Sequence, residues 1–133
     1  MNNVNKMAIN EDNACETNPS YETQESVNRY LLRYWGQEDE IWSSTYKSQF
    51  NKPEVTDLAQ YYVDLITKHT NNFGRAIDIG CAAGRASFEL ARSFEEVIGI
   101  DYSHALIDAA NILKDTGEHE YSRKILGSEI YAA

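Results

Sequence analysis

The sequence predicts an α/β fold built around two parallel strands. Two short apolar segments, RAIDIG and EVIGID, flank a segment with helical periodicity, RASFELARSF. Strand, helix and strand in this order form a right-handed crossover, which makes the two strands parallel. Because parallel sheets are normally covered on both faces, we expect other helical segments of the chain to pack on this unit.

The composition is that of one small globular domain. The chain has 133 residues, of which 42% are hydrophobic and 25% charged, and these values exclude a wholly disordered or fibrous protein. It contains no run of roughly 18 apolar residues and no apolar leader, so we expect no membrane partner and a cytoplasmic location. A net charge of −9 repels phosphate and argues against nucleic acid as a partner. Its two cysteines are too few for a disulfide framework and show no metal-ligand spacing.

The first half of the chain is predicted to hold a tail, two helices and a loop. Residues 1–20 are rich in asparagine without periodicity, so we expect a disordered tail followed by one domain over 21–133. Apolar residues at helical spacing predict a helix over about Thr23 to Trp35, with Thr23 as its N-cap. Polar and aromatic residues over Gln37 to Pro53 predict a connecting loop. A second apolar stripe predicts a helix over about Glu54 to His69 that packs on the sheet.

The second half alternates strands and helices. The predicted strands are RAIDIG, which starts at Arg75, and EVIGID, which ends at Asp101. Apolar periodicity extends the helix between them through Phe94. Ser103 is the expected N-cap of a third long helix, and Gly117 is expected to end it.

A third strand is predicted near the end of the sequence, beginning within Lys124 to Tyr131. Three strands are fewer than a usual sheet has, and the last one would form an unprotected edge. We therefore expect either a partner chain that covers this edge or a fold that is truncated after about the third strand.

The turn after the first strand has the composition of a ligand-binding turn. Positions 80–84 read GCAAG, and such small side chains let a ligand approach the backbone closely. The following helix presents N–H groups and the positive end of its dipole at the same place. Asp101 lies 23 residues after Asp78, at the end of the second strand, where a carboxylate can accept hydrogen bonds from ribose hydroxyls. The sequence therefore predicts an adenosine-containing ligand.

The charge beside this turn favours S-adenosylmethionine over a nicotinamide dinucleotide. Asp78 stands two residues before Gly80, where its carboxylate would repel a pyrophosphate but attract the ammonium group of S-adenosylmethionine. The turn also departs from the G-x-G-x-x-G pattern of dinucleotide-binding proteins. An NAD-dependent enzyme is the less favoured alternative.

These motifs resemble those of a known enzyme class. DIGCAAG and VIGIDYS are similar to the first two motifs of the class I S-adenosylmethionine-dependent methyltransferases, with Ala82 in place of the usual middle glycine. More narrowly, the chain resembles the 4-mercaptohistidine N1-methyltransferase domain of ovothiol biosynthesis through YETQESVNRYLLRYWG, GCAAGRASFELAR and YSRKILGSEI. The resemblance covers about Ser20 to Tyr131. It implies a Rossmann-like fold whose seven-stranded sheet is truncated here.

The resemblance also implies an activity. It indicates methyl transfer from S-adenosylmethionine to an imidazole nitrogen of a thiolated histidine, which is a small-molecule substrate. A methyltransferase with another small-molecule substrate and a catalytically inactive truncated fragment are the alternatives. No catalytic residue is assigned, and the isolated positions of His69, His104 and His119 predict no metal site.

The predicted cofactor site has nine residues. They are Asp78, Gly80, Cys81, Ala82, Gly84, Arg85, Asp101, Tyr102 and Tyr21. Six of them have an alternative structural role. Cys81 suits a buried small residue, Arg85 a salt bridge, and Tyr102 simple packing. Asp78 suits a cap of neighbouring N–H groups, and Gly80 and Gly84 suit the backbone geometry of the turn alone. Tyr21 is expected as a lid contact, because the segment before the first strand often lies over the cofactor in methyltransferases.

Overall fold

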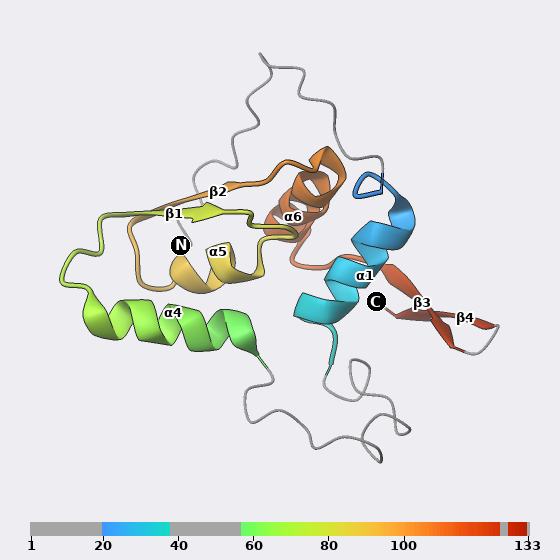
Figure 1. Ribbon diagram of the computed structural model, residues 1–133, viewed down its shortest axis with the longest axis horizontal. Helices are drawn as coiled ribbons and strands as arrows, with labels where there is room; N and C mark the ends of the chain where they lie inside the picture. The colour runs from blue at the N-terminus through green and yellow to red at the C-terminus, as the bar shows by residue number, and fades with distance from the viewer. Residues whose placement is uncertain (1–19, 38–56, 126–127, 133) are drawn as a thin grey trace.

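The computed structural model describes residues 20–37, 57–125 and 128–132 (Figure 1). Its helices and strands, in chain order, are α1 (Gln24–Trp35), α4 (Leu58–His69), β1 (Arg75–Ile79), α5 (Arg85–Leu90), β2 (Glu96–Ile100), α6 (His104–Thr116), β3 (Tyr121–Ile125) and β4 (Ser128–Ala132). All of the predicted tail except Ser20, and all of the predicted loop except Gln37, lie outside the described residues. The predicted order of strand, helix, strand and helix from Arg75 onward is confirmed.

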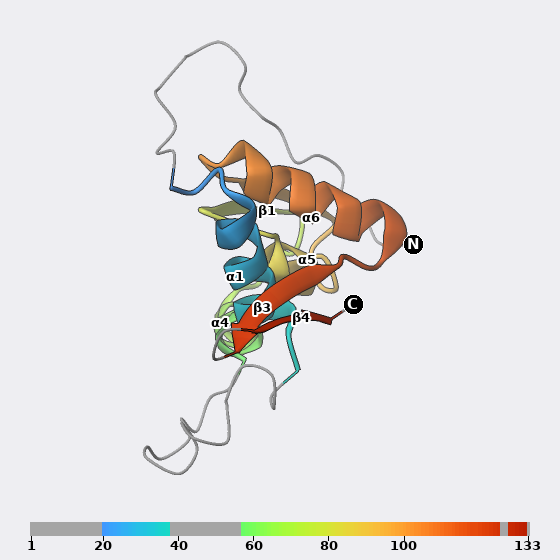
Figure 2. The same ribbon diagram turned by 90° about the vertical axis from the view of Figure 1, so that its right-hand side faces the viewer.

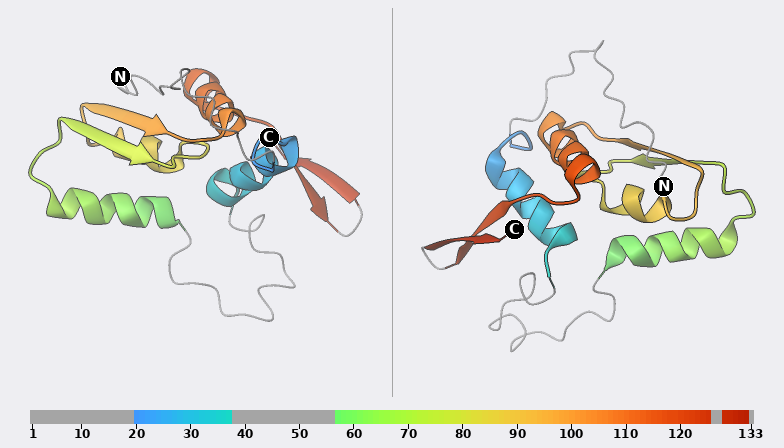
Figure 3. Two further views of the ribbon diagram at one scale, coloured as in Figure 1. Left: turned by 45° about the horizontal axis from the view of Figure 1, so that its top comes forward. Right: turned by 180° about the vertical axis from the view of Figure 1, so that it is seen from behind.

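β1 and β2 form the predicted parallel pair. Their register places Ile77 beside Ile98 and Ile79 beside Ile100, so the two strands end together. The turn after β1 and Asp101 after β2 therefore lie at the same edge, where parallel sheets bind their ligands. α5 connects the two strands and lies between them and α4 (Figure 3).

Two groups of buried side chains hold the helices in place. The first joins α1 to α6, to β3 and to the turn after β1, through Val27, Leu31, Ala83, Leu106, Ala109 and Tyr121. The second joins α4 to α5 and β2, through Val63, Leu90, Phe94 and Val97. A polar contact adds to the first group, since Asn28 Nδ2 of α1 donates to Ser122 Oγ of β3 at 2.8 Å. α1 is thus fixed between α6 and β3 (Figure 2).

Side-chain caps fix where three helices begin. The side chain of each N-cap accepts a hydrogen bond from the N–H three residues later, and these N-caps are Thr23, Asp57 and Ser103. Gly117 ends α6 with a φ of +81°, a conformation that suits glycine. The predicted caps Thr23, Ser103 and Gly117 are confirmed. The start predicted for α4 at Glu54 lies outside the described residues.

α5 is shorter than predicted, because it ends at Leu90 instead of running through Phe94. Turns follow it, in which the N–H of Ser93 donates to the carbonyl of Leu90 at 2.9 Å. Phe94 is buried in the second core group, and the next N–H, of Glu95, donates to the carbonyl of Phe73. Tertiary packing therefore ends the helix at Leu90, although the apolar periodicity of the sequence continues to Phe94.

The prediction of a third strand in the parallel sheet is wrong. β3 and β4 pair with each other in antiparallel fashion, with Tyr121 beside Ala132 and Ile125 beside Ser128. Within the described residues, they form a sheet separate from β1 and β2. The pattern of Lys124 to Tyr131 does not distinguish one strand from parts of two, because both arrangements show the same alternation.

The parallel pair has an open face. Ile77 and Ile79 of β1 are 56% and 83% exposed. The partner chain expected along the edge of the sheet stays a prediction. No helix in residues 20–37 or 57–125 is long and apolar enough to cross a membrane.

Candidate functional site

The turn between β1 and α5 leaves open space beside Gly80. Gly80, Ala82 and Gly84 have positive φ values of +80°, +49° and +83°. A Cβ placed on Gly80 would meet no heavy atom of the described chain within 4 Å. Packing inside the protein therefore does not exclude a side chain at Gly80, and the free space beside its backbone suits a ligand. Ala82 adopts a backbone that costs an L-residue about 1–2 kcal/mol.

The turn is hydrogen-bonded to the end of β2. The N–H groups of Gly80 and Cys81 donate to the carbonyl of Ile100 at 2.7 and 3.0 Å. The N–H of Ala82 donates to Asp101 Oδ2 at 2.8 Å, and the other carboxylate oxygen accepts from the following turn, through Ser103 N at 2.9 Å. Each carboxylate oxygen has two lone pairs, so Asp101 can still accept hydrogen bonds from a ligand.

A cavity of about 330 Å³ lies at this junction. It is lined by Tyr21, Tyr30, Tyr34, Gly80, Ala82, Asp101, Tyr102, Ser103 and Leu106. Five of these belong to the predicted cofactor site, namely Tyr21, Gly80, Ala82, Asp101 and Tyr102. The structure thus brings together residues from the start of α1, the turn after β1 and the end of β2.

The other predicted residues do not line this cavity; they are Asp78, Cys81, Gly84 and Arg85. Four lining residues were not predicted, namely Tyr30, Tyr34, Ser103 and Leu106. Tyr30 and Tyr34 lie on one face of α1 at helical spacing, which is a signal in the sequence. That spacing does not reveal what the face contacts.

Three tyrosines form one wall of the cavity. The rings of Tyr30 and Tyr34 are stacked with centroids 6.0 Å apart, and the Tyr21 ring lies 6.4 Å from that of Tyr30. Burial, together with the neighbouring Tyr21, raises the pKa of Tyr30 above its ordinary value. Tyr30 therefore stays a neutral phenol at physiological pH, and its ring presents an apolar surface.

The segment before α1 is attached to the start of α6. Ser103 Oγ donates to the carbonyl of Tyr21 at 3.2 Å, and the N–H of Ala105 donates to Glu22 Oε2 at 3.0 Å. Thr23 then caps α1. The YET sequence that begins the resemblance thus holds the tyrosine wall next to Asp101.

Asp78 and Cys81 face the body of the protein. Ser87 Oγ of α5 donates to Asp78 Oδ2 at 2.7 Å. The thiol of Cys81 is buried against β2, where a Cβ on Gly99 would lie 3.0 Å from its sulfur atom. Burial, with the nearby Asp78 and Asp101 carboxylates, raises the pKa of Cys81 to about 12. This thiol is therefore protonated and is not a nucleophile.

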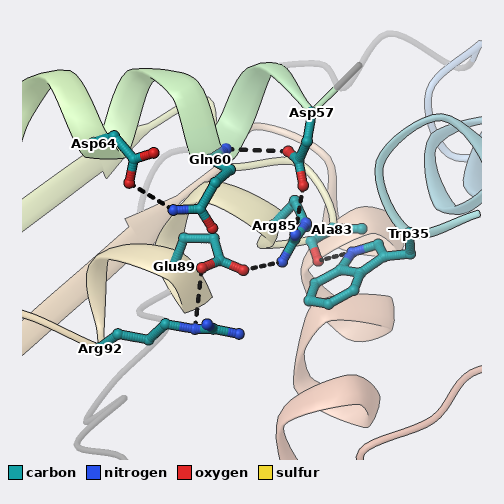
Figure 4. Close-up of polar contacts among 8 residues, drawn as sticks. All are labelled: Trp35, Asp57, Gln60, Asp64, Ala83, Arg85, Glu89 and Arg92. Atoms are coloured by element: carbon teal, nitrogen blue, oxygen red, sulfur yellow. Dashed lines mark hydrogen bonds and ion pairs between the residues drawn. The ribbon is translucent and has the colours of Figure 1, made fainter. Parts of the chain in front are cut away.

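Arg85 is held in a network of charged groups (Figure 4). Its guanidinium forms ion pairs with Asp57, at 2.6 Å, and with Glu89. It also lies 5.1 Å from the ring centroid of Trp35, and the indole N–H of Trp35 donates to the Ala83 carbonyl at 3.1 Å. The side chain thus links α1, α4 and α5 directly behind the turn.

The acidic partners of Arg85 favour its charged form. Burial alone lowers the pKa of Arg85, but the contacts with Asp57 and Glu89 outweigh it, so the pKa is raised. The Glu89 side chain is 2% exposed and also pairs with Arg92. The structure shows the salt-bridge role of Arg85, while its contact with a cofactor stays a prediction. Among residues 20–37, 57–125 and 128–132, no group of three or more acidic, histidine or cysteine side chains is placed to hold a metal ion.

The part of the chain that contains this junction is similar in sequence to known proteins. Residues 71–123 match a family described as "Methyltransferase domain". The match runs from just before β1 into β3. A protein of Saccharomyces cerevisiae, described as "Probable S-adenosylmethionine-dependent methyltransferase", is 37% identical over 62 residues, which are 47% of this chain and 21% of the relative. The chain thus spans about a fifth of the length of the relative that it matches.

Proposed function

We propose that this chain binds S-adenosylmethionine in the cavity beside Gly80 and Asp101. The match of residues 71–123 to a methyltransferase-domain family supports the proposal, as does the similarity to a probable S-adenosylmethionine-dependent methyltransferase. The observation that carries the proposal is that open space at Gly80 and the Asp101 carboxylate share one cavity. The parallel pair with its helices then represents the cofactor-binding half of a Rossmann-like class I fold. NAD is disfavoured, because the GCAAG turn departs from the G-x-G-x-x-G pattern of dinucleotide-binding proteins.

Each cavity residue has a distinct part in this proposal. Asp101 accepts hydrogen bonds from the ribose hydroxyls, and its bonds from Ala82 and Ser103 hold it in place. The backbone at Gly80 permits close approach, and the half-exposed ring of Tyr102 covers one face of the adenine. Asp78 lies outside this cavity and accepts a hydrogen bond from Ser87, so its contact with the cationic amino-acid end of the cofactor stays a prediction.

The proposed reaction is methyl transfer to an imidazole nitrogen of a thiolated histidine. S-adenosylmethionine supplies a methyl group on a sulfonium, which is already a strong methyl donor. The protein therefore needs to align the acceptor and exclude water, and the tyrosine wall of α1 is suited to both tasks. The acceptor rests on the resemblance of the YET segment and the GCAAGRASFELAR block to ovothiol-biosynthesis methyltransferases. Another small-molecule acceptor and an inactive fragment are the competing possibilities.

Titration calorimetry with S-adenosylhomocysteine tests the cofactor site. We expect micromolar binding by the folded chain, and Asp101→Ala should weaken it by about tenfold to a hundredfold, because hydrogen bonds to a charged group are lost. Asp108→Ala is the matched control, since it removes an exposed carboxylate from α6. Circular dichroism establishes that each variant is folded. Equal affinity of Asp101→Ala and the parent chain would contradict the assignment.

A methyl-transfer assay separates the enzyme from its alternatives. Radiolabelled S-adenosylmethionine and 4-mercapto-L-histidine should give a labelled N-methylimidazole product. Transfer to a different small molecule alone would keep the enzyme class and reject the acceptor. Cofactor binding without transfer to any acceptor would support the inactive-fragment alternative.

A further inference from the structure

A second cavity, of about 540 Å³, adjoins the cofactor cavity. It is lined by Ser20, Tyr21, Ser26, Arg29, Tyr30, Arg33 and Tyr34. The three tyrosines also line the first cavity, so the two cavities share these residues. A molecule in the second cavity would therefore lie directly next to the cofactor position.

The second cavity is positively charged in an acidic protein. Among the described residues that line it, Arg29 and Arg33 are charged and none is acidic, although the whole chain carries a net charge of −9. The two arginines are four positions apart, which puts them on the same face of α1. Like charges at this spacing destabilise a helix, so their arrangement favours a bound anion.

The arginines are available to a ligand. Within the described residues, neither arginine takes part in an ion pair. Arg29 Nη2 donates to Ser26 Oγ at 3.1 Å, and the buried Ser26 hydroxyl in turn donates to the carbonyl of Ser20 at 2.5 Å. This contact fixes one edge of the Arg29 guanidinium, and no other contact of its N–H groups is seen within residues 20–37, 57–125 and 128–132. Burial raises the pKa of Tyr30, and the charge of Arg29 opposes this rise, so Arg29 lies close to the tyrosine wall.

We propose that this cavity is the acceptor site, in which Arg29 and Arg33 bind a carboxylate of the methyl acceptor. The planar guanidinium matches a carboxylate through paired hydrogen bonds. The rings of Tyr21, Tyr30 and Tyr34 offer flat apolar surface to a planar heterocycle. Both features together select a small ring compound with a carboxylate, and the acceptor part of the inference rests on the proposed function. An arginine pair also binds phosphate, and the test below distinguishes the two anions.

The test compares L-histidine with histamine, which share the imidazole and the amino group and differ in the carboxylate. Each is titrated into the ¹⁵N-labelled full chain and followed by NMR. We expect L-histidine to bind about tenfold more tightly, which corresponds to one charge-assisted interaction. This preference opposes the net charge of the protein, which by itself attracts the more cationic histamine.

A variant that lacks the positive charges of Arg29 and Arg33 tests whether these residues cause the preference for L-histidine. The double substitution Arg29→Gln, Arg33→Gln should abolish the preference for L-histidine. Lys68→Gln, which removes one exposed positive charge from α4, should leave it unchanged. Equal binding of the two compounds by the parent chain, or a preference that survives the double substitution, would overturn the inference. Saturation by inorganic phosphate at lower concentration than by L-histidine would overturn the assignment to a carboxylate.

The cofactor titration keeps the two proposals distinguishable. If S-adenosylhomocysteine binds but L-histidine and histamine bind equally, the proposed acceptor site is wrong and the proposed cofactor site stands. If S-adenosylhomocysteine fails to bind a folded chain while the preference for L-histidine depends on both arginines, the carboxylate site stands and the proposed methyltransferase function falls.

Discussion

Replacing Arg85 with methionine tests whether this side chain belongs to the scaffold behind the turn. Its two acidic partners differ in burial: the Glu89 side chain is 2% exposed, whereas that of Asp57 is 42% exposed. Without Arg85, the buried carboxylate of Glu89 keeps only Arg92, whose side chain is 72% exposed. The main energetic effect of the substitution should therefore come from Glu89.

We expect Arg85→Met to lower the free energy of unfolding by about 2–4 kcal/mol. Removing one partner of a buried ion pair costs about 3–5 kcal/mol, and the remaining contact with Arg92 reduces this value. The exposed contact with Asp57 adds less than about 1 kcal/mol, because solvent screens it. Loss of the contact with the Trp35 ring adds about 0.5–1 kcal/mol.

Urea unfolding followed by circular dichroism measures this effect in a double-mutant cycle. The cycle compares Arg85→Met, Glu89→Met and the double variant. The double variant should lose less stability than the two single losses together, because it leaves no buried carboxylate without its partner. Arg75→Met is the matched control: its ion pair with Glu96 is 66% and 33% exposed, so its loss should be within about 0.5 kcal/mol.

Strictly additive losses in this cycle would refute the reasoning, as would a loss below about 1 kcal/mol for Arg85→Met. The same variant also tests the predicted contact between Arg85 and the cofactor. A purely structural role leaves the affinity of the folded variant for S-adenosylhomocysteine unchanged. A tenfold weaker affinity would indicate that Arg85 contacts the cofactor.

Three further predictions concern the turn, its thiol and the N-cap of α4. Ala82→Gly relieves the backbone strain of a residue with a φ of +49°, so it should raise the free energy of unfolding by about 0.5–1 kcal/mol. Urea unfolding measures this change, and a destabilised variant would contradict strain at this residue. The pKa of Cys81 is raised from 9.0 to about 12, so iodoacetamide at pH 8 should label this thiol about a thousandfold more slowly in the folded chain than in the urea-unfolded chain. Peptide mass spectrometry measures the two labelling rates. Equal rates would indicate an accessible thiolate in the folded chain. Burial raises the pKa of Asp57, but hydrogen bonds from Gln60 and Arg85 outweigh it and leave the pKa below its ordinary value of 3.8. Its contribution to stability is therefore complete above about pH 4 and declines as the pH falls further, so thermal unfolding between pH 6 and pH 3 should show a smaller decline for Asp57→Asn than for the parent chain.

The parts of the fold that depend on local chemistry are readable from the sequence. RAIDIG and EVIGID are apolar enough to predict strands, and the helix between them makes the pair parallel. Thr23 and Ser103 predict helix starts because their hydroxyls accept from the first turn, and Gly117 predicts an end because it tolerates a positive φ. The same local reasoning identified the turn at 80–84 and the acid after the second strand.

The walls of the cavities depend on tertiary packing and are not readable in this way. Tyr30 and Tyr34 line the cofactor cavity because α1 docks on α6 and β3, and their spacing predicts a shared face without its contacts. Arg85 finds Asp57 28 residues away, on a helix whose position no local pattern specifies. The end of α5 and the pairing of β3 with β4 were missed for the same reason, since packing and long-range pairing override periodicity.

The turn after β1 is held in shape by hydrogen bonds to the end of β2. Gly80 and Cys81 share the carbonyl of Ile100, and Ala82 is held by Asp101, so these hydrogen-bond acceptors all lie at or just beyond the end of that strand. None belongs to β1 or α5, between which the turn runs. The conformation of the turn therefore depends on the position of β2 beside β1, which couples the formation of the sheet to that of the cavity. A chain in which β2 slipped or detached would lose this cavity, although every residue of the turn would be unchanged.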